Sequence, residues 1–210
     1  MPLKEKGTNK KLQEVSLFFV EGETEIEFYT KEIARHFPTL KKRIINLHGN
    51  SNIHRKVLGK AFDFINKNKE YVIRIFCCVD RESRDHNPPL DINELSKSIC
   101  ENPLLEKHVI SVDKVIATQM IESWFFYDIE GIYRYLRAPR KERNPSKYQP
   151  PEKYTHIDLS KLFERYGKTY IKGKKCKYFI DNLDIIRIYN ECQELKDGIK
   201  LVEKRIKASE

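Results

Sequence analysis

The sequence lacks the patterns by which several classes of protein are recognised. Its five cysteines form no C-x-x-C pair and no Cys/His cluster at zinc-ligand spacing, so neither a structural zinc site nor a disulfide framework is expected. No apolar run reaches the length of a membrane span, and the Lys-rich stretch 1–11 lacks the apolar segment of a signal peptide. These absences predict a cytoplasmic protein with reduced thiols and no membrane partner.

Glycine is also scarce, with eight residues in a chain of 210. The sequence Gly167-Lys168-Thr169 has neither the upstream glycine nor the preceding strand of a phosphate-binding loop. We therefore expect no ATP site in this chain, and any dependence on ATP would come from a separate protein. The hydrophobic fraction of 40% is nevertheless enough for a core, and the length is that of one domain.

What the sequence does contain is an alternation of short apolar runs and amphipathic segments. The runs at 15–20, 43–47, 71–79 and 108–116 are rich in strand-forming residues, and helical spacing follows each of them. Gly22 permits a sharp turn after the first run, and Thr24 and Thr118 are expected to open the helices at 25–35 and 119–127. This alternation predicts an α/β fold, with a mainly parallel sheet of four or five strands flanked by helices on both faces.

The second half of the chain is expected to be helical and to complete the same domain. Residues 1–136 form the expected α/β core, 137–157 a basic, proline-rich insertion, and 158–210 a helical C-terminal part. The insertion contains four prolines and many charges, which predicts a loop too polar to pack. The short stretch 168–172, between two glycines, fits either a final strand or a loop.

Positive charge is concentrated in one part of the chain. Residues 137–177 contain thirteen Lys and Arg against four Asp and Glu, a net charge of +9 that equals the charge of the whole chain. Such a surplus favours a polyanionic partner, with nucleic acid first, although a solvated basic insertion would have the same composition. The candidate residues for nucleic-acid binding are Arg137, Arg140, Lys141, Arg143, Lys168 and Lys174.

Carboxylates follow two of the expected strands. Glu21 ends the first strand and Asp80 ends the third, with Glu82 and Asp85 a few residues later. The carboxyl edge of an open α/β sheet is where ligands bind, and clustered carboxylates favour Mg²⁺ or Mn²⁺. The alternative for Asp80–Asp85 is a solvated loop with local Arg–Asp pairs. Glu122, in an otherwise apolar helix, fits a metal ligand, a supporting group, a partner for arginine or a solvent-facing position.

Four short motifs, in this order, resemble those of the Toprim superfamily. They are V-E-G-E-T-E at 20–25, D-R-E at 80–82, E-S-W at 122–124 and Y-I-K at 170–172. They are most similar to the small stand-alone RloB-like proteins related to OLD nucleases. The resemblance implies a Rossmann-like Toprim fold that binds Mg²⁺ or Mn²⁺. One departure is Glu82, where the commoner motif has Asp; Asp85 lies nearby as a substitute.

The same resemblance implies roles for individual residues. Glu21 would be the acid/base or metal-bridging carboxylate, Asp80 and Glu82 would hold the metal, and Glu122 would support the site. Lys172 would stabilise charge on the phosphate. The implied activity is a metal-dependent nuclease in prokaryotic defence against phage or foreign DNA, often beside a partner ATPase.

Two other functions fit the sequence. One is a catalytically silent Toprim-like subunit that binds nucleic acid or a partner protein, which the departure at Glu82 favours. The other is a receiver-type phosphoacceptor with Asp80 phosphorylated and Thr118 after the fourth strand. Such a site needs an acid pair after the first strand and a lysine directly after the fifth, and the sequence fulfils the first requirement only loosely. The sequence leaves open whether the substrate is DNA or RNA and whether the protein forms a homo-oligomer.

Overall fold

The computed structural model describes residues 12–81 and 87–208 and shows an α/β fold built on a parallel sheet. In the described residues the sheet has four strands in the order β2-β1-β3-β4, with every neighbouring pair parallel. The strands are β1 (Gln13–Val20), β2 (Lys42–Asn46), β3 (Tyr71–Arg81) and β4 (Val109–Thr118). The predicted parallel sheet of an α/β fold is therefore confirmed.

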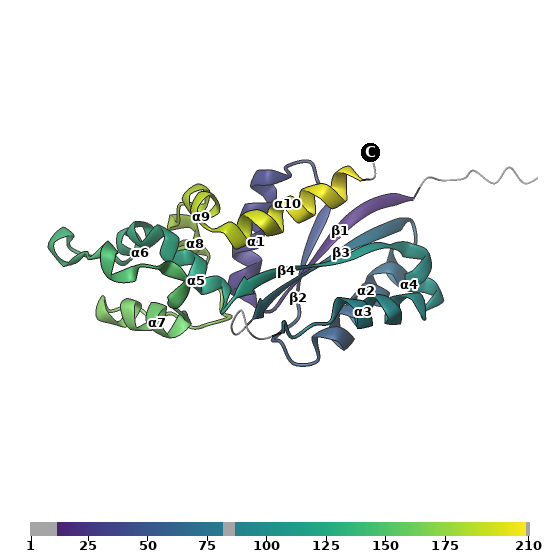
Figure 1. The fold of residues 1–210 in the computed structure, drawn as a ribbon, viewed down its shortest axis with the longest axis horizontal. Helices are drawn as coiled ribbons and strands as arrows, with labels where there is room; N and C mark the ends of the chain where they lie inside the picture. The colour runs from purple at the N-terminus through teal and green to yellow at the C-terminus, as the bar shows by residue number, and fades with distance from the viewer. Residues whose placement is uncertain (1–11, 82–86, 209–210) are drawn as a thin grey trace, which may run out of the picture.

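Helices cover both faces of the sheet and extend beyond the carboxyl ends of its strands (Figure 1). On one face lie α2 (Ile53–Lys67), α3 (Ile92–Cys100) and α4 (Pro103–His108), and on the other α1 (Glu23–His36) and α10 (Gln193–Lys207). Past the carboxyl ends of the strands is a helical lobe, residues 121–191. It contains α5 (Ile121–Phe125), α6 (Ile129–Leu136), α7 (His156–Arg165), α8 (Lys177–Asn182), α9 (Ile185–Glu191) and the short 3₁₀ turns η1 (Phe126–Asp128), η2 (Arg140–Glu142), η3 (Pro145–Tyr148) and η4 (Pro151–Lys153).

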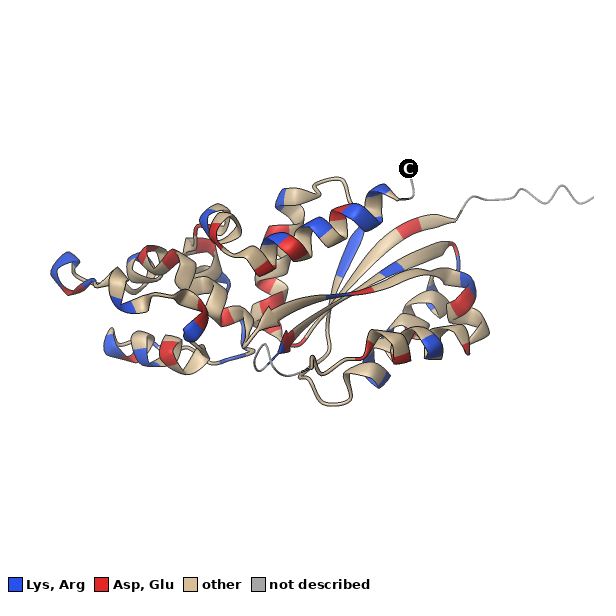
Figure 2. Ribbon diagram, in the orientation of Figure 1, with Lys and Arg blue, Asp and Glu red and all other residues tan. Residues whose placement is uncertain are grey.

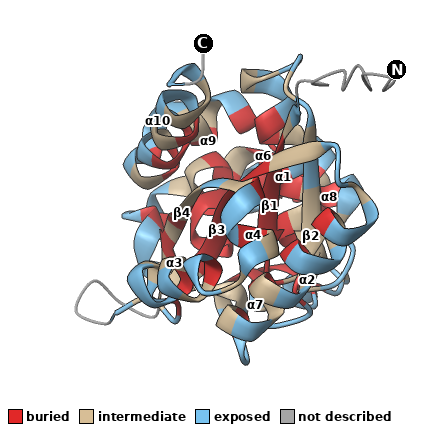
Figure 3. Ribbon diagram, turned by 90° about the vertical axis from the view of Figure 1, so that its right-hand side faces the viewer, coloured by how far each residue is buried: buried red, intermediate tan, exposed pale blue. Residues whose placement is uncertain are grey.

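Both faces of the sheet are buried, which explains why the strands are almost continuously apolar. Phe18 and Phe76 point to the face covered by α1 and α10, where their rings stack 4.9 Å apart. Leu17 and Ile75, one residue earlier in their strands, point to the face covered by α2, α3 and α4. Figure 3 shows these buried strands enclosed between the helices. The alternation along each strand thus builds two cores.

The strand order reverses direction between β1 and β3. The chain passes from β1 to β2 on one side and then returns to place β3 on the other side of β1, where Phe19 pairs with Cys77. In open α/β sheets such a switch point leaves a crevice at the carboxyl ends of the two strands, and ligands bind there. The first and third strands are neighbours in the sheet, which places Glu21 and Asp80 together at this crevice.

Both predicted threonine caps are wrong. Helix α1 begins after Gly22, and the hydroxyl of Thr24 instead donates to the carbonyl oxygen of Lys174 at 3.2 Å. Thr118 is the last residue of β4, where it pairs with Arg81, and its N–H donates to the carboxylate of Glu194 at 2.9 Å; α5 begins only at Ile121. Partners distant in sequence occupy both threonines, and local spacing does not reveal them.

The insertion at 137–157 is not too polar to pack, contrary to the prediction from its sequence. Tyr148 is only 7% exposed, and its ring stacks on Phe126 with centroids 5.4 Å apart. Pro151 is also buried. The charged residues of the insertion remain outside while these apolar ones complete the core of the helical lobe. The stretch 168–172 is a loop rather than a strand.

The packing of α10 on the sheet predicts a stability effect at Gly198. A Cβ there would lie 2.6 Å from Cγ1 of Val115 on β4, so Gly198→Ala is expected to destabilise the protein by about 1–3 kcal/mol. Gly59→Ala, on α2 with no atom within 4 Å, is the control and is expected to stabilise by about 0.5–1 kcal/mol. Urea unfolding measures both. Equal effects of the two substitutions would contradict the close approach of α10 to β4.

Candidate active site at the carboxyl edge of the sheet

Glu21 and Asp80 meet at the switch point. The backbone N–H of Asp80 donates a hydrogen bond of 3.2 Å to Oε1 of Glu21, so the two residues belong to one site as predicted. Glu21 is only 8% exposed. The carboxylate of Asp80 contacts the helical lobe, where its Oδ1 accepts a hydrogen bond from the N–H of Ile121 at 3.2 Å. The ends of two adjacent strands therefore position both carboxylates.

Lys172, in the loop between α7 and α8, lies beside this pair of carboxylates. Its ammonium donates to Oδ2 of Asp80 at 3.3 Å. The loop that carries it passes close to α1, where the N–H of Glu23 donates to the carbonyl oxygen of Gly173 at 3.2 Å. Only glycine fits at position 22 without movement, since a Cβ there would lie 3.0 Å from Cα of Gly173. Gly22 thus permits the approach of the lysine loop to this edge of the sheet.

Two further carboxyl groups are buried behind the strand ends. Glu122 is fully buried, and its Oε1 accepts a hydrogen bond of 2.7 Å from the hydroxyl of Tyr170. Glu25 is 4% exposed. Oε2 of each has no hydrogen-bond partner among the described residues. Of the alternatives that the sequence left open for Glu122, the solvent-facing position is excluded, and a role inside the site remains.

Glu25 and Tyr170 are site residues that reasoning from the sequence missed. The sequence predicts Glu25 only as the start of a helix, yet it lies four residues after Glu21 and within the first turn of α1. Its place at the end of the V-E-G-E-T-E motif is the available signal. For Tyr170 the signal is its place in the Y-I-K motif at 170–172, in which the resemblance implies a role only for Lys172.

Burial and the neighbouring charges shift the pKa values of the carboxyl groups in the site. Burial, opposed by the N–H of Asp80, raises the pKa of Glu21 above its usual range. Burial and the charge of Glu122 raise the pKa of Glu25 to about 7. Burial and the charge of Glu21 also raise the pKa of Asp80 well above its usual range. Burial acts to lower the pKa of Lys172, but Asp80 and Glu122 outweigh it, so this pKa is raised and the ammonium is kept.

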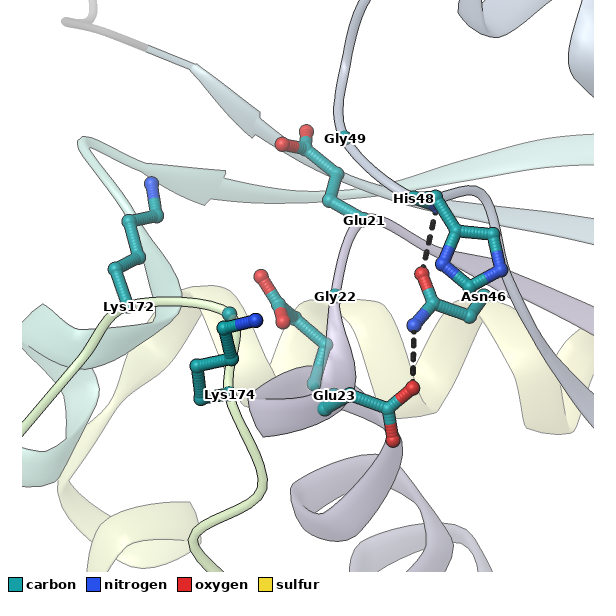
Figure 4. A pocket seen from close by; sticks show the side chains of 10 residues that line it. Glu21, Gly22, Glu23, Asn46, His48, Gly49, Lys172 and Lys174 are labelled. Atoms are coloured by element: carbon teal, nitrogen blue, oxygen red, sulfur yellow. Dashed lines mark hydrogen bonds between the residues drawn. The ribbon is translucent and has the colours of Figure 1, made fainter.

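Two cavities open on either side of this centre, and Glu21 and Lys172 line both of them. The β2-side cavity has a volume of about 360 Å³ and is lined also by Gly22, Glu23, Glu25, Asn46, His48, Gly49, Gly173 and Lys174. In Figure 4 Lys172 and Lys174 lie on one side of this cavity, with Asn46 and His48 on the other. The β4-side cavity has a volume of about 470 Å³ and is lined also by Asn50, Asp80, Asn87, Pro89, Gln119 and Met120.

The chemistry of the donors fits a hard cation, whereas their arrangement is incomplete for one. Carboxylate oxygens are the ligands that Mg²⁺ and Mn²⁺ prefer, and Oε2 of Glu25 lacks any other partner among the described residues. Yet within residues 12–81 and 87–208 no three side chains of His, Cys, Asp or Glu are grouped so as to hold a metal ion. Lys172 instead supplies the positive charge next to Asp80. The predicted ligands Glu82 and Asp85 lie outside the described residues.

The predicted nucleic-acid-binding residues are spread over the helical lobe rather than gathered at the site. Figure 2 shows Lys and Arg distributed over its helices and loops. Lys174 alone of the six lines the β2-side cavity. Arg143 and Lys168 are engaged within the lobe, with the carbonyl oxygens of Ala138 at 3.0 Å and Tyr135 at 2.6 Å respectively. The others, Arg137, Arg140 and Lys141, are exposed.

The fold and this edge together define an open α/β protein with an acidic site at its topological switch point. The chain belongs to the family described as "Domain of unknown function (DUF4276)", whose model matches residues 20–200 and so includes the whole site. No curated protein matches the chain, and no solved structure does. In the parts of the chain that the structure describes, no helix has the length and apolar character needed to span a membrane.

Proposed function

We propose that this protein is a metal-dependent nuclease of Toprim-like type that cleaves phosphodiester bonds in DNA or RNA. The observation that carries the proposal is the meeting of Glu21 and Asp80 at the switch point, with the Lys172 ammonium 3.3 Å from Asp80. Carboxylates and a cation gathered in an open crevice match what phosphoryl transfer needs, which is positioning and stabilisation of negative charge.

The position of each residue in the site suggests its role in the proposed reaction. Glu21, which lines both cavities, accepts or returns a proton at the reacting oxygen, and burial raises its pKa in the direction that favours proton uptake. Lys172 approaches the phosphate and stabilises its negative charge. Glu21 and Asp80, supported by Glu25 and Glu122, would hold Mg²⁺ or Mn²⁺. A bound metal of this kind supplies an activated water and further charge stabilisation.

A catalytically silent subunit is the second candidate, and one observation favours it. Asp80 is already paired with Lys172, and the described residues hold no group of three metal-ligating side chains. In this alternative the crevice binds nucleic acid or a partner protein without cutting. For either function the resemblance to RloB-like proteins supports a place in prokaryotic defence, and any dependence on ATP would come from a separate ATPase, since the sequence contains no ATP-binding motif.

Metal binding tests the site directly. Asp80→Asn is expected to weaken Mn²⁺ binding at least about tenfold, because removal of one carboxylate removes a ligand. Lys172→Met, which removes the competing cation, is expected to bind Mn²⁺ at least as tightly as the parent. Asp63→Asn, on an exposed part of α2, is the control. Calorimetric titration with Mn²⁺ measures all four proteins. If Asp80→Asn binds Mn²⁺ as well as the parent, Asp80 is not a ligand.

The basic insertion is tested by the salt dependence of binding. Arg140→Ala with Lys141→Ala is expected to lower the slope of log affinity against log salt by about 2, since each neutralised phosphate releases counterions. Arg143 is left in place because it pairs with Glu130 and supports the lobe. Lys67→Ala with Lys69→Ala, exposed near the opposite edge of the sheet, is the control. An unchanged slope in the first variant would favour a solvated loop.

A further inference from the structure

The two cavities beside the catalytic centre have the arrangement of subsites for a polymer. They share Glu21 and Lys172 and otherwise have different linings. One lies along the ends of β1 and β2, and the other extends from Asn50, in the loop after β2, past the end of β3 to Gln119 after β4. A reacting phosphate at Glu21 therefore has a hollow on each side of it. A monomeric substrate would use one hollow, whereas a chain that crosses the centre would use both.

The size of each hollow limits what enters it. Volumes of about 360 and 470 Å³ lie at the lower end of small-molecule sites, which span roughly 300–1,000 Å³. Each therefore accommodates one nucleoside. A paired duplex presents bases that are stacked and hydrogen-bonded, and a base enters a pocket of this kind only after it leaves the stack.

The linings offer unused polar groups. Oε1 of Gln119, beside the β4-side cavity, is buried without a hydrogen-bond partner among the described residues. Gln119 and Asn50 carry carboxamides, and such groups pair with the edges of bases. Gln119 also has a left-handed backbone, with φ of 64°, a conformation that is costly for a residue other than glycine and is found at ligand sites.

The β2-side cavity contains a similar set. Glu25, which is only 4% exposed, is one of the lining residues, and its buried Oε2 has no hydrogen-bond partner in the described part of the chain. Asn46 is held by two hydrogen bonds, as donor to Glu23 at 2.8 Å and as acceptor from the N–H of His48 at 2.7 Å (Figure 4). This arrangement is organised before any ligand arrives, and Lys174 adds a positive charge at its rim.

We propose that the two cavities hold the nucleotides on either side of the scissile phosphate, so that the substrate is an unpaired strand or loop of nucleic acid and not a paired duplex. This inference rests on the proposed nuclease function and adds the class of substrate. Base and sugar enter from the side, the phosphate lies between Glu21 and Lys172, and the basic residues of the helical lobe contact the strand further along.

Binding without metal tests the inference. Fluorescence anisotropy with a labelled strand of about 12 nucleotides and with a hairpin duplex of the same sequence, in chelator, is expected to show about tenfold or more tighter binding of the unpaired strand. Ribose and deoxyribose versions of the strand form separate arms, and a preference for the unpaired form in either arm supports the proposal. Equal affinity for strand and duplex in both arms overturns it.

A substitution at the rim of one cavity tests whether the preference for the unpaired strand arises there. Asn50→Trp, at an exposed position on the rim of the β4-side cavity, is expected to weaken strand binding about tenfold and to leave duplex binding unchanged. Asp63→Trp, beside a remote cavity between α2 and α4, is the control, and thermal unfolding checks that both variants fold. A preference that survives Asn50→Trp overturns the assignment of the subsite.

The outcomes separate this inference from the nuclease proposal. If the protein prefers the unpaired strand in chelator but cuts nothing with any metal, the subsites stand and the nuclease proposal falls. If it cuts paired and unpaired nucleic acid equally well, the nuclease proposal stands and the subsites fall.

Discussion

Glu21→Gln is expected to lower Mg²⁺- or Mn²⁺-dependent cleavage by about 100-fold or more while leaving nucleic-acid binding nearly unchanged. Acid–base catalysis by a positioned side chain contributes about 10²–10⁴-fold, and the amide loses this along with the negative charge. Glutamine keeps the size of the side chain, and its carbonyl oxygen still accepts the N–H of Asp80. Binding is spared because the basic residues lie on the helical lobe and not at the strand end.

The assay uses supercoiled DNA and structured RNA, with each metal and with chelator, and with any ATPase that is encoded beside the protein. Glu27→Gln, also on α1 but away from both cavities, is the matched control and is expected to cut like the parent. If Glu21→Gln cuts as well as the parent, the residue assignment is wrong even if the class of enzyme is right. If the parent cuts nothing under any of these conditions, the silent binding subunit becomes the better account.

Glu25→Gln is expected to stabilise the metal-free protein by about 1–3 kcal/mol at pH 8. The pKa of Glu25 is raised from 4.5 to about 7 because burial and Glu122 disfavour its charged form. A raised carboxyl pKa means that the folded protein binds the proton more tightly than the unfolded chain. Stability therefore falls as the pH rises from about 4.5 to about 7, and the complete loss corresponds to about 3 kcal/mol.

Urea unfolding at about pH 5 and about pH 8, on either side of the Glu25 pKa and in chelator, measures the effect. The parent is expected to be less stable at the higher pH, and Glu25→Gln to reduce that difference without removing it, because the pKa values of Glu21 and Asp80 are raised as well. Glu203→Gln on α10 is the control, since its partner Lys207 lowers its pKa and so its removal brings no gain at the higher pH. A pH dependence that Glu25→Gln leaves intact would show that Glu25 is not its source.

The cluster of carboxyl groups at the strand ends also affects the folding free energy of the protein. Glu21, Asp80 and Lys172 line the crevice, Glu25 and Glu122 are buried beside it, and burial raises the pKa of Glu21, Glu25 and Asp80. Such a cluster costs folding free energy, and clusters with raised carboxyl pKa values are concentrated at functional sites. The cost is a reason to regard the crevice as functional, because any cation that binds there also relieves the repulsion between these carboxyl groups.

The sheet and the placement of its first two carboxylates follow from the sequence. Short runs of apolar side chains specify buried strands, and β–α–β spacing favours parallel neighbours, so Glu21 and Asp80 were expected at one edge, where the structure has them. The predicted strands agree with the observed ones to within two residues at each end. These features depend on local periodicity, which a single sequence displays.

The surroundings of that edge depend on contacts between segments far apart in the chain. The hydrogen bond from Lys172 to Asp80 joins residues 92 positions apart, and the one from Tyr170 to Glu122 joins residues 48 apart. The resemblance to Toprim proteins placed Lys172 in the site, but nothing in the sequence showed that it pairs with Asp80 or that Glu25 is buried beside them. Local spacing sets which face of a helix or strand is apolar, whereas the contact between two distant loops depends on how the whole helical lobe packs against the sheet.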